Sequence, residues 1–176
     1  MAARAVIFGC AGTSLAASES AFFRDANPWG FILFARNVEA PRQVAALVEQ
    51  LRAVVGRADA PVLIDQEGGR VARLTPPHWR KAPPAAAFGR LYVSNPEAAR
   101  EACYLNARLL ADELTGLGIT VDCAPVLDIP AAGSHQIIGD RAFGTDPDCV
   151  AELGRAMCEG LLAGGVLPVI KHIPGH

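Results

Sequence analysis

The feature that most constrains the fold is a set of short, unbroken apolar runs separated by longer segments with helical periodicity. An unbroken apolar run is typical of a parallel strand that is buried on both faces. Strands that alternate with helices indicate a parallel sheet with right-handed crossover connections. The sequence therefore predicts an α/β fold, with strands at residues 5–8, 30–34, 62–64, 119–123 and 166–170.

Proline, glycine and capping residues predict where the helices begin and end. Pro41 suits a first helical position, and apolar residues then repeat at helical spacing as far as Gly56. Residues 94–97 (SNPE) match a capping box that begins a long helix. The proline-rich segment 75–84 is not expected to form regular structure.

Composition limits the kind of protein this can be. The 176 residues, 51% of them hydrophobic, suffice for one domain with its own core. A formal net charge of −2, with no long run of one sign, argues against binding to nucleic acid or to an anionic membrane surface. The amino-terminal apolar run is too short for a signal peptide, so a cytoplasmic location is expected. Five cysteines without a Cys-x-x-Cys pair favour reduced thiols over disulfides or a zinc site.

Polar side chains follow the ends of three predicted strands. Asp65 ends the third strand, Asp128 and Arg141 lie beyond the fourth, and Lys171 and His172 follow the fifth. Because parallel strands all end at the same edge of a sheet, these side chains are expected to gather on one rim.

The spacing alone leaves the role of this rim open. Carboxylates and cations together suit a ligand rich in hydroxyl groups, whereas two cations and a histidine would also suit a phosphate or a carboxylate. The loop at residues 9–14 (GCAGTS) lacks the Gly-Lys-Ser/Thr core of a phosphate loop, which favours an uncharged sugar or polyol. Equally, Asp65 or Arg141 could form a structural ion pair, and His172 could be a packed core histidine.

Five motifs resemble, in order, the signatures of the glycoside hydrolase family 3 β-N-acetylglucosaminidases. The last motif is similar to the bacterial N-acetylhexosaminidase branch of peptidoglycan recycling rather than to the β-glucosidase branch, although Ile173 stands where phenylalanine is more usual. The motifs are residues 30–37 (GFILFARN), 64–71 (IDQEGGRV), 124–128 (APVLD), 139–143 (GDRAF) and 171–176 (KHIPGH).

The resemblance implies that residues 1–176 are the amino-terminal portion of a single (β/α)8 barrel catalytic domain and supply about its first five β/α units. The implied activity is retaining hydrolysis of terminal β-linked N-acetylglucosamine from peptidoglycan fragments (muropeptides), with no cofactor and no metal. A complete barrel usually needs about 250 residues, so the chain is expected to be inactive alone and to require a carboxyl-terminal half. The alternative is a truncated, inactive sugar-binding or assembly module.

The resemblance also assigns roles to individual residues. The catalytic acid/base histidine and the nucleophilic aspartate are expected beyond His176, so no catalytic residue is assigned within the chain. Supporting roles fall to Glu67, Arg70 and Asp128, and no metal-ligand spacing connects His78, His135 and His176. The residues implied to bind the sugar are Asp65, Arg73, Arg141, Lys171 and His172.

Overall fold

A single five-stranded parallel sheet organises the molecule. The computed structural model describes residues 2–131, 133 and 135–176, and its strands lie in the order β1-β2-β3-β6-β7. Every neighbouring pair in this sheet is parallel, which confirms the predicted α/β arrangement. The strands are β1 (Arg4–Phe8), β2 (Pro28–Leu33), β3 (Val62–Ile64), β6 (Val121–Asp122) and β7 (Leu167–Pro168).

The last two strands are shorter than their apolar runs. Ladder-like hydrogen bonds nevertheless continue past β7, since the Val169 amide donates to the Asp122 carbonyl at 2.8 Å. An isolated parallel bridge then joins Val126 to Lys171. The chain beyond β7 therefore still runs alongside the chain beyond β6, and this carries Lys171 to the rim next to the end of β3.

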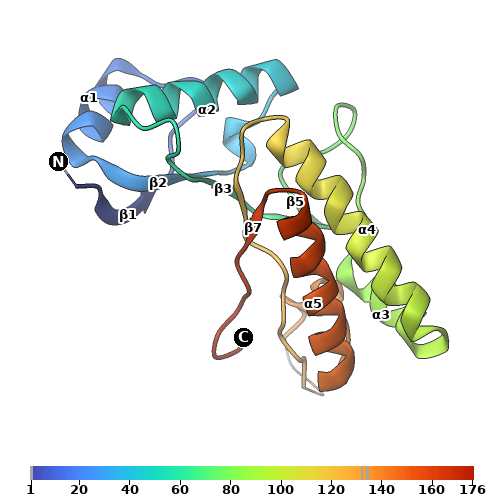
Figure 1. Ribbon diagram of the computed structural model, residues 1–176. Helices are drawn as coiled ribbons and strands as arrows, with labels where there is room; N and C mark the ends of the chain where they lie inside the picture. The colour runs from blue at the N-terminus through green and yellow to red at the C-terminus, as the bar shows by residue number, and fades with distance from the viewer. Residues whose placement is uncertain (1, 132, 134) are drawn as a thin grey trace.

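Four helices connect consecutive strands of the sheet. They are α1 (Ala17–Ala26), α2 (Pro41–Val55), α4 (Pro96–Thr115) and α5 (Pro147–Ala163). Figure 1 shows α1 and α2 beside the β1–β3 end of the molecule, with α4 and α5 side by side at the other end. The predicted boundaries at Pro41 and Gly56 are confirmed, because Pro41 is the first residue of α2 and Gly56 closes the helix in the left-handed conformation.

The structure corrects the predicted start of the long helix. The capping residue of α4 is Asn95 and not Ser94, because the Asn95 side chain accepts the Ala98 amide at 3.1 Å. Ser94 instead ends a helix that the sequence analysis missed, and its hydroxyl donates to the Leu91 carbonyl. The missed elements are the helix α3 (Ala85–Ser94), the antiparallel hairpin β4 (Gln66–Gly68) and β5 (Val71–Ala72), and the 3-10 turns η1 (Ala35–Asn37) and η2 (Gly139–Arg141). Segment 75–84 contains no helix or strand, as predicted.

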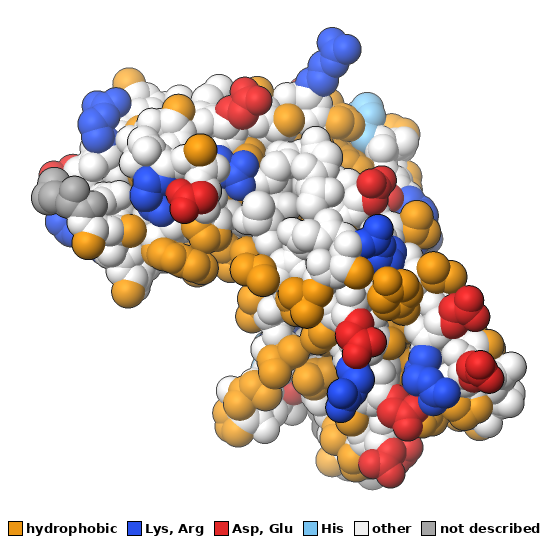
Figure 2. All heavy atoms as spheres, viewed as in Figure 1, with side chains coloured by type: hydrophobic (Ala, Val, Ile, Leu, Met, Phe, Trp, Pro, Cys, Tyr) orange, Lys and Arg blue, Asp and Glu red, His pale blue; other side chains and the backbone are white. Residues whose placement is uncertain are grey.

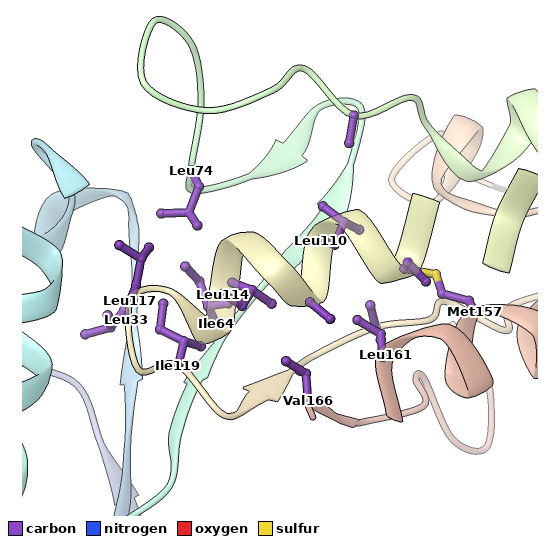
Figure 3. Close-up of a cluster of buried hydrophobic side chains, with 14 of the residues drawn as sticks. Leu33, Ile64, Leu74, Leu110, Leu114, Leu117, Ile119, Met157, Leu161 and Val166 are labelled. Atoms are coloured by element: carbon purple, nitrogen blue, oxygen red, sulfur yellow. The ribbon is translucent and has the colours of Figure 1, made fainter. Parts of the chain in front are cut away.

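The main core lies between the sheet and the helices α4 and α5. Figure 3 shows side chains from β2, β3, α4 and α5 meeting in one cluster. Each fully buried aliphatic side chain of this cluster stabilises the fold by roughly 1.5–3 kcal/mol relative to an exposed one. The labelled side chains with no exposed surface are Leu33, Ile64, Leu74, Leu110, Leu114, Ile119, Leu161 and Val166.

The sheet does not close into a barrel within the described residues, because β1 and β7 each have only one neighbouring strand. Apolar side chains remain exposed at both edges, including Ile7 and Trp29 near β1 and Leu167 and Ile170 near β7. Figure 2 shows hydrophobic side chains gathered along one side of the molecule. Among the helices the structure describes, none combines the length and the apolar character needed to cross a bilayer.

Candidate functional site

The predicted rim exists and is centred on Asp65, directly after β3. Lys171, brought there by the chain beyond β7, donates from Nζ to Asp65 Oδ1 at 2.9 Å. The same Nζ lies 2.6 Å from Glu67 Oε1, on the hairpin strand β4. One ammonium group thus joins two carboxylates that belong to the same turn of chain.

The hairpin β4–β5 holds Arg73 against this pair. Arg73 Nη2 donates to Asp65 Oδ2 at 3.0 Å. The buried Gln66 side chain fixes the return of the chain, because its Oε1 accepts the amides of Arg73 and Leu74 and its Nε2 donates to the Leu74 carbonyl. The missed hairpin is therefore the element that brings Arg73 back to Asp65.

Arg141 joins the cluster through Glu67. Its Nε and Nη2 donate to the two oxygens of Glu67, each at 2.8 Å, in a bidentate pair whose side chains are only 13% and 6% exposed. Arg141 lies in the turn η2. Arg70, between β4 and β5, joins this turn to the hairpin, because it donates to Asp140 Oδ1 at 2.9 Å and to the Ile137 carbonyl at 2.6 Å. Glu67 and Arg70 thus position the loop that carries Arg141.

His172 lies beside the cluster and is held by Asp128. Its Nδ1 is 2.6 Å from Asp128 Oδ2, and the other oxygen of Asp128 accepts the His176 amide at 2.8 Å. Since Asp128 engages Nδ1, the ring nitrogen left to contact a ligand is Nε2. The structure thus brings Asp65, Arg73, Arg141 and Lys171 into one network and places His172 next to it on the residue after Lys171.

The charges of the network are mutually stabilised. Burial opposes ionisation of Asp65, but the hydrogen bonds and positive charges of Lys171 and Arg73 lower its pKa below the usual value. Burial likewise disfavours the charged form of Lys171, yet Glu67 and Asp65 raise its pKa. The Glu67 hydrogen bonds raise the pKa of Arg141. Asp65, Lys171 and Arg141 are therefore charged at neutral pH. The network pairs three basic side chains with two acidic ones, a formal balance of 3 − 2 = +1.

One carboxyl group behaves differently. Asp122, at the end of β6, is fully buried, and burial raises its pKa to about 8. Its Oδ1 accepts the Gln66 amide at 2.9 Å, whereas its Oδ2 has no hydrogen-bond partner among the described residues. The sequence analysis missed this residue, although an aspartate inside an apolar strand was a signal that could have identified it.

The arrangement can bind a ligand that both donates and accepts hydrogen bonds. Carboxylates accept from hydroxyl and amide groups, and the guanidinium and ammonium groups donate to ring oxygens and carbonyls. Across the part of the chain that the structure describes, no three His, Cys, Asp or Glu residues are grouped as metal ligands. A cavity of about 750 Å³ is lined by α3 and by residues between 135 and 149, and none of the five predicted sugar-binding residues is in its lining.

The chain is similar to known proteins along almost its whole length. Residues 12–176 match the glycosyl hydrolase family 3 N terminal domain. The chain is 39% identical over 173 residues to a β-hexosaminidase of Xylella fastidiosa, and 39% identical over 171 residues to one of Xanthomonas campestris. Each match covers 97% of this chain and 50% of the relative, so the chain spans about half the length of the curated relatives it matches.

Solved structures show the same relationship. The chain superposes on native NagZ from Neisseria gonorrhoeae with a TM-score of 0.92 and 32% identity, covering 99% of this chain and 50% of that one. The same protein has been solved in complex with N-trifluoroacetyl-D-glucosamine, also with a TM-score of 0.92. The likeness confirms the predicted barrel-type α/β fold, of which five parallel strands are present without closure of the barrel.

Proposed function

Because the chain belongs to glycosyl hydrolase family 3, we propose that it forms part of a β-N-acetylhexosaminidase that removes terminal β-linked N-acetylglucosamine with retention of configuration. The observation that carries this proposal is the network of Asp65, Arg73, Arg141 and Lys171 at the carboxyl ends of the strands, within a chain that matches the family from residue 12 to residue 176. β-Hexosaminidase relatives at 39% identity support it.

The five residues of this rim are proposed to hold the sugar. Asp65 accepts hydrogen bonds from ring hydroxyls, while Arg73, Arg141 and Lys171 donate to hydroxyl or carbonyl oxygens. His172 contributes Nε2, because Asp128 fixes the opposite nitrogen. Since the ion pairs hold these groups in place before the sugar arrives, little ordering is required on binding. Glu67 keeps Arg141 and Lys171 at fixed positions and is assigned a positioning role.

Retaining hydrolysis needs an acid/base group and a nucleophile on either side of the scissile bond. We assign both to residues outside these 176, and with them the three or so β/α units that complete a barrel. Residues 1–176 then form the amino-terminal portion of one catalytic domain, whose partner is its own carboxyl-terminal half. In this reaction the present chain binds and orients the sugar and performs no covalent step itself.

The proposed substrate is a muropeptide, that is, an N-acetylglucosaminyl fragment of peptidoglycan, in the recycling of the cell wall. The proposed location is the cytoplasm. The muropeptide proposal comes from the resemblance of the KHIPGH motif at residues 171–176 to the peptidoglycan-recycling branch of the family, and neither proposal depends on the geometry of the rim. No cofactor enters this scheme, because glycoside hydrolysis by two protein side chains requires none.

Two measurements test the proposal. Calorimetry of the 176-residue chain with N-acetylglucosamine should detect binding at the rim. A chromogenic β-N-acetylglucosaminide should be hydrolysed by the intact gene product and left uncleaved by the 176-residue chain alone. An intact, folded gene product that binds the sugar but releases no chromophore would instead favour the second candidate, a non-catalytic sugar-binding or assembly module. Absence of both binding and hydrolysis would contradict each candidate.

A further inference from the structure

One cation near the rim has no acidic partner. Arg36 lies in the turn η1, which follows β2, and its guanidinium carbon sits 4.6 Å from the centre of the Phe34 ring. Its Nε donates to the Cys10 carbonyl at 2.9 Å. The other guanidinium N–H groups have no hydrogen bond or ion pair to any residue that the structure describes, whereas Arg70, Arg73 and Arg141 each pair with a carboxylate.

The strand register places Arg36 next to the proposed sugar site. Ile32 pairs with Leu63 and Leu33 with Ile64, so the next step brings Phe34 beside Asp65. A Cβ atom built on Gly9 would lie 3.1 Å from Arg36 Nη2, which places the guanidinium over the ends of β1 and β2. The guanidinium lies at the loop after β1, and Asp65 follows β3, two strands away in the sheet. With neighbouring strands about 4.8 Å apart, the two groups are therefore about 10 Å apart along the rim, roughly the width of two sugar rings.

The local structure holds this arginine in position. The fully buried Asn37 donates from Nδ2 to the carbonyls of Cys10 and Gly12, and its Oδ1 accepts the Phe34 amide. These bonds fix the turn that carries Arg36 to the loop after β1. The carboxylate of Glu19 is already engaged by the amides of Ala11 and Ala16, at 2.8 and 3.1 Å.

We propose that Arg36 is an anion-binding residue at the edge of the sugar site, and that it receives a carboxylate carried by the leaving group of the glycoside. The inference rests on the proposed function, because it takes the sugar ring to lie on Asp65 and its neighbours. A guanidinium presents parallel N–H donors that match the two oxygens of a carboxylate, and the Phe34 ring beneath it keeps one face of the group out of water. The site therefore favours substrates whose leaving group is negatively charged.

The test compares two ligands that differ in one charge. Calorimetry of the 176-residue chain is carried out with 3-carboxypropyl β-N-acetylglucosaminide and with its methyl ester. We expect the carboxylate to bind about five-fold more tightly, which is the upper end for a partly exposed ion pair. Taking the ratio of the two dissociation constants within each variant cancels any general effect on the pocket. Arg36→Gln should bring this ratio to about one, and Arg36→Lys should retain part of the preference.

The control is Arg42→Gln, an exposed arginine on the neighbouring helix α2, which should leave the ratio unchanged. Raising the salt concentration should reduce the wild-type preference, because an exposed pair is screened.

If Arg36→Gln unfolds, the ratio of dissociation constants in Arg36→Lys tests the inference instead. A folded lysine variant with no preference for the carboxylate contradicts the inference. Equal binding of both ligands by the wild type, or an unchanged ratio in Arg36→Gln, overturns the role of Arg36 and leaves the sugar site standing. Failure of both ligands to bind removes the sugar site and Arg36 together.

Discussion

The core beneath the helices and the polar rim above β3 hold their side chains in different ways. In the core, Leu114 and Leu161 are fully buried and interact with many neighbours without directional bonds. In the rim, Asp65 and Glu67 each contact two cations at defined distances. Removing a core side chain lowers packing energy, whereas removing one rim cation leaves each carboxylate with its second cation and takes away hydrogen-bond donors for a ligand. The core should therefore determine stability, and the rim should determine ligand binding.

The largest expected effect is on the core. Leu114→Ala should lower the free energy of unfolding by about 2–5 kcal/mol, because it removes a fully buried side chain that neighbouring helices cannot replace. Urea unfolding measures the change. The affinity of the folded fraction for N-acetylglucosamine should stay the same, since Leu114 belongs to the hydrophobic core cluster and not to the ion-pair network of the rim.

The matched control is Leu109→Ala, on the same helix α4 but with a side chain that is 52% exposed. Its effect on stability should be within about 0.5 kcal/mol. A Leu114→Ala variant that stays stable but loses sugar affinity would show that core and rim are not separable in this way.

Asp122 tests the boundary between the two regions, because it is as buried as the core yet faces the charges of Lys171, Asp65 and Glu67. Its pKa is raised to about 8 by burial, whereas an unfolded aspartate ionises near pH 3.9. Folding therefore favours the protonated acid, so its contribution is complete below about pH 4 and is lost as the pH rises to about 8. The slope is at most about 1.4 kcal/mol per pH unit.

Unfolding measured from pH 5 to pH 9 with Asp122→Asn checks this prediction. The amide keeps an oxygen for the Gln66 amide but does not ionise, so the variant should lack the decline in stability that the wild type shows up to pH 8. The pKa of Asp65 is lowered, so its contribution to stability is lost only as the pH falls below about 4, outside this window. Parallel pH profiles for the two proteins would contradict a neutral Asp122.

The rim itself is tested by Arg141→Ala. This change removes two charge-assisted donors and should weaken N-acetylglucosamine binding by roughly 1.5–3 kcal/mol, measured by calorimetry on the 176-residue chain. Stability should fall less than in Leu114→Ala, because Lys171 still compensates Glu67. Arg155→Ala, an exposed arginine on α5, serves as the control. Unchanged affinity in Arg141→Ala would remove this residue from the proposed site.

Sequence reasoning predicted the sheet and the gathering of charges for one physical reason. The apolar runs required buried parallel strands, and parallel strands bring Asp65 and Lys171, 106 positions apart, to one rim. That placement depends only on the strands being parallel neighbours, and the alternation of strands and helices along the sequence indicates such an arrangement.

The contacts within the rim could not be predicted in the same way. The hairpin strands β4 and β5 have three and two residues, too few for a periodic pattern, so the central position of Glu67 between Lys171 and Arg141 was not expected. The helix α3 was missed because prolines precede it and Gly89 lies inside it. That glycine is required by close packing, since a Cβ atom there would lie 1.6 Å from the Phe143 carbonyl oxygen.

The smallest effect is expected outside both regions. Arg100 pairs with Glu152 at 2.6 Å between α4 and α5, but both side chains are 43% exposed. Because water screens such a pair, Arg100→Ala should not measurably shift the urea midpoint. Double-mutant cycles then sharpen the comparison. Arg141 and Glu67, in the shielded rim, should show a coupling energy of at least about 0.5 kcal/mol, and Arg100 and Glu152 should show none that can be measured. Equal coupling energies in the two pairs would mean that the burial of the rim pair does not make it stronger than the exposed pair on the surface.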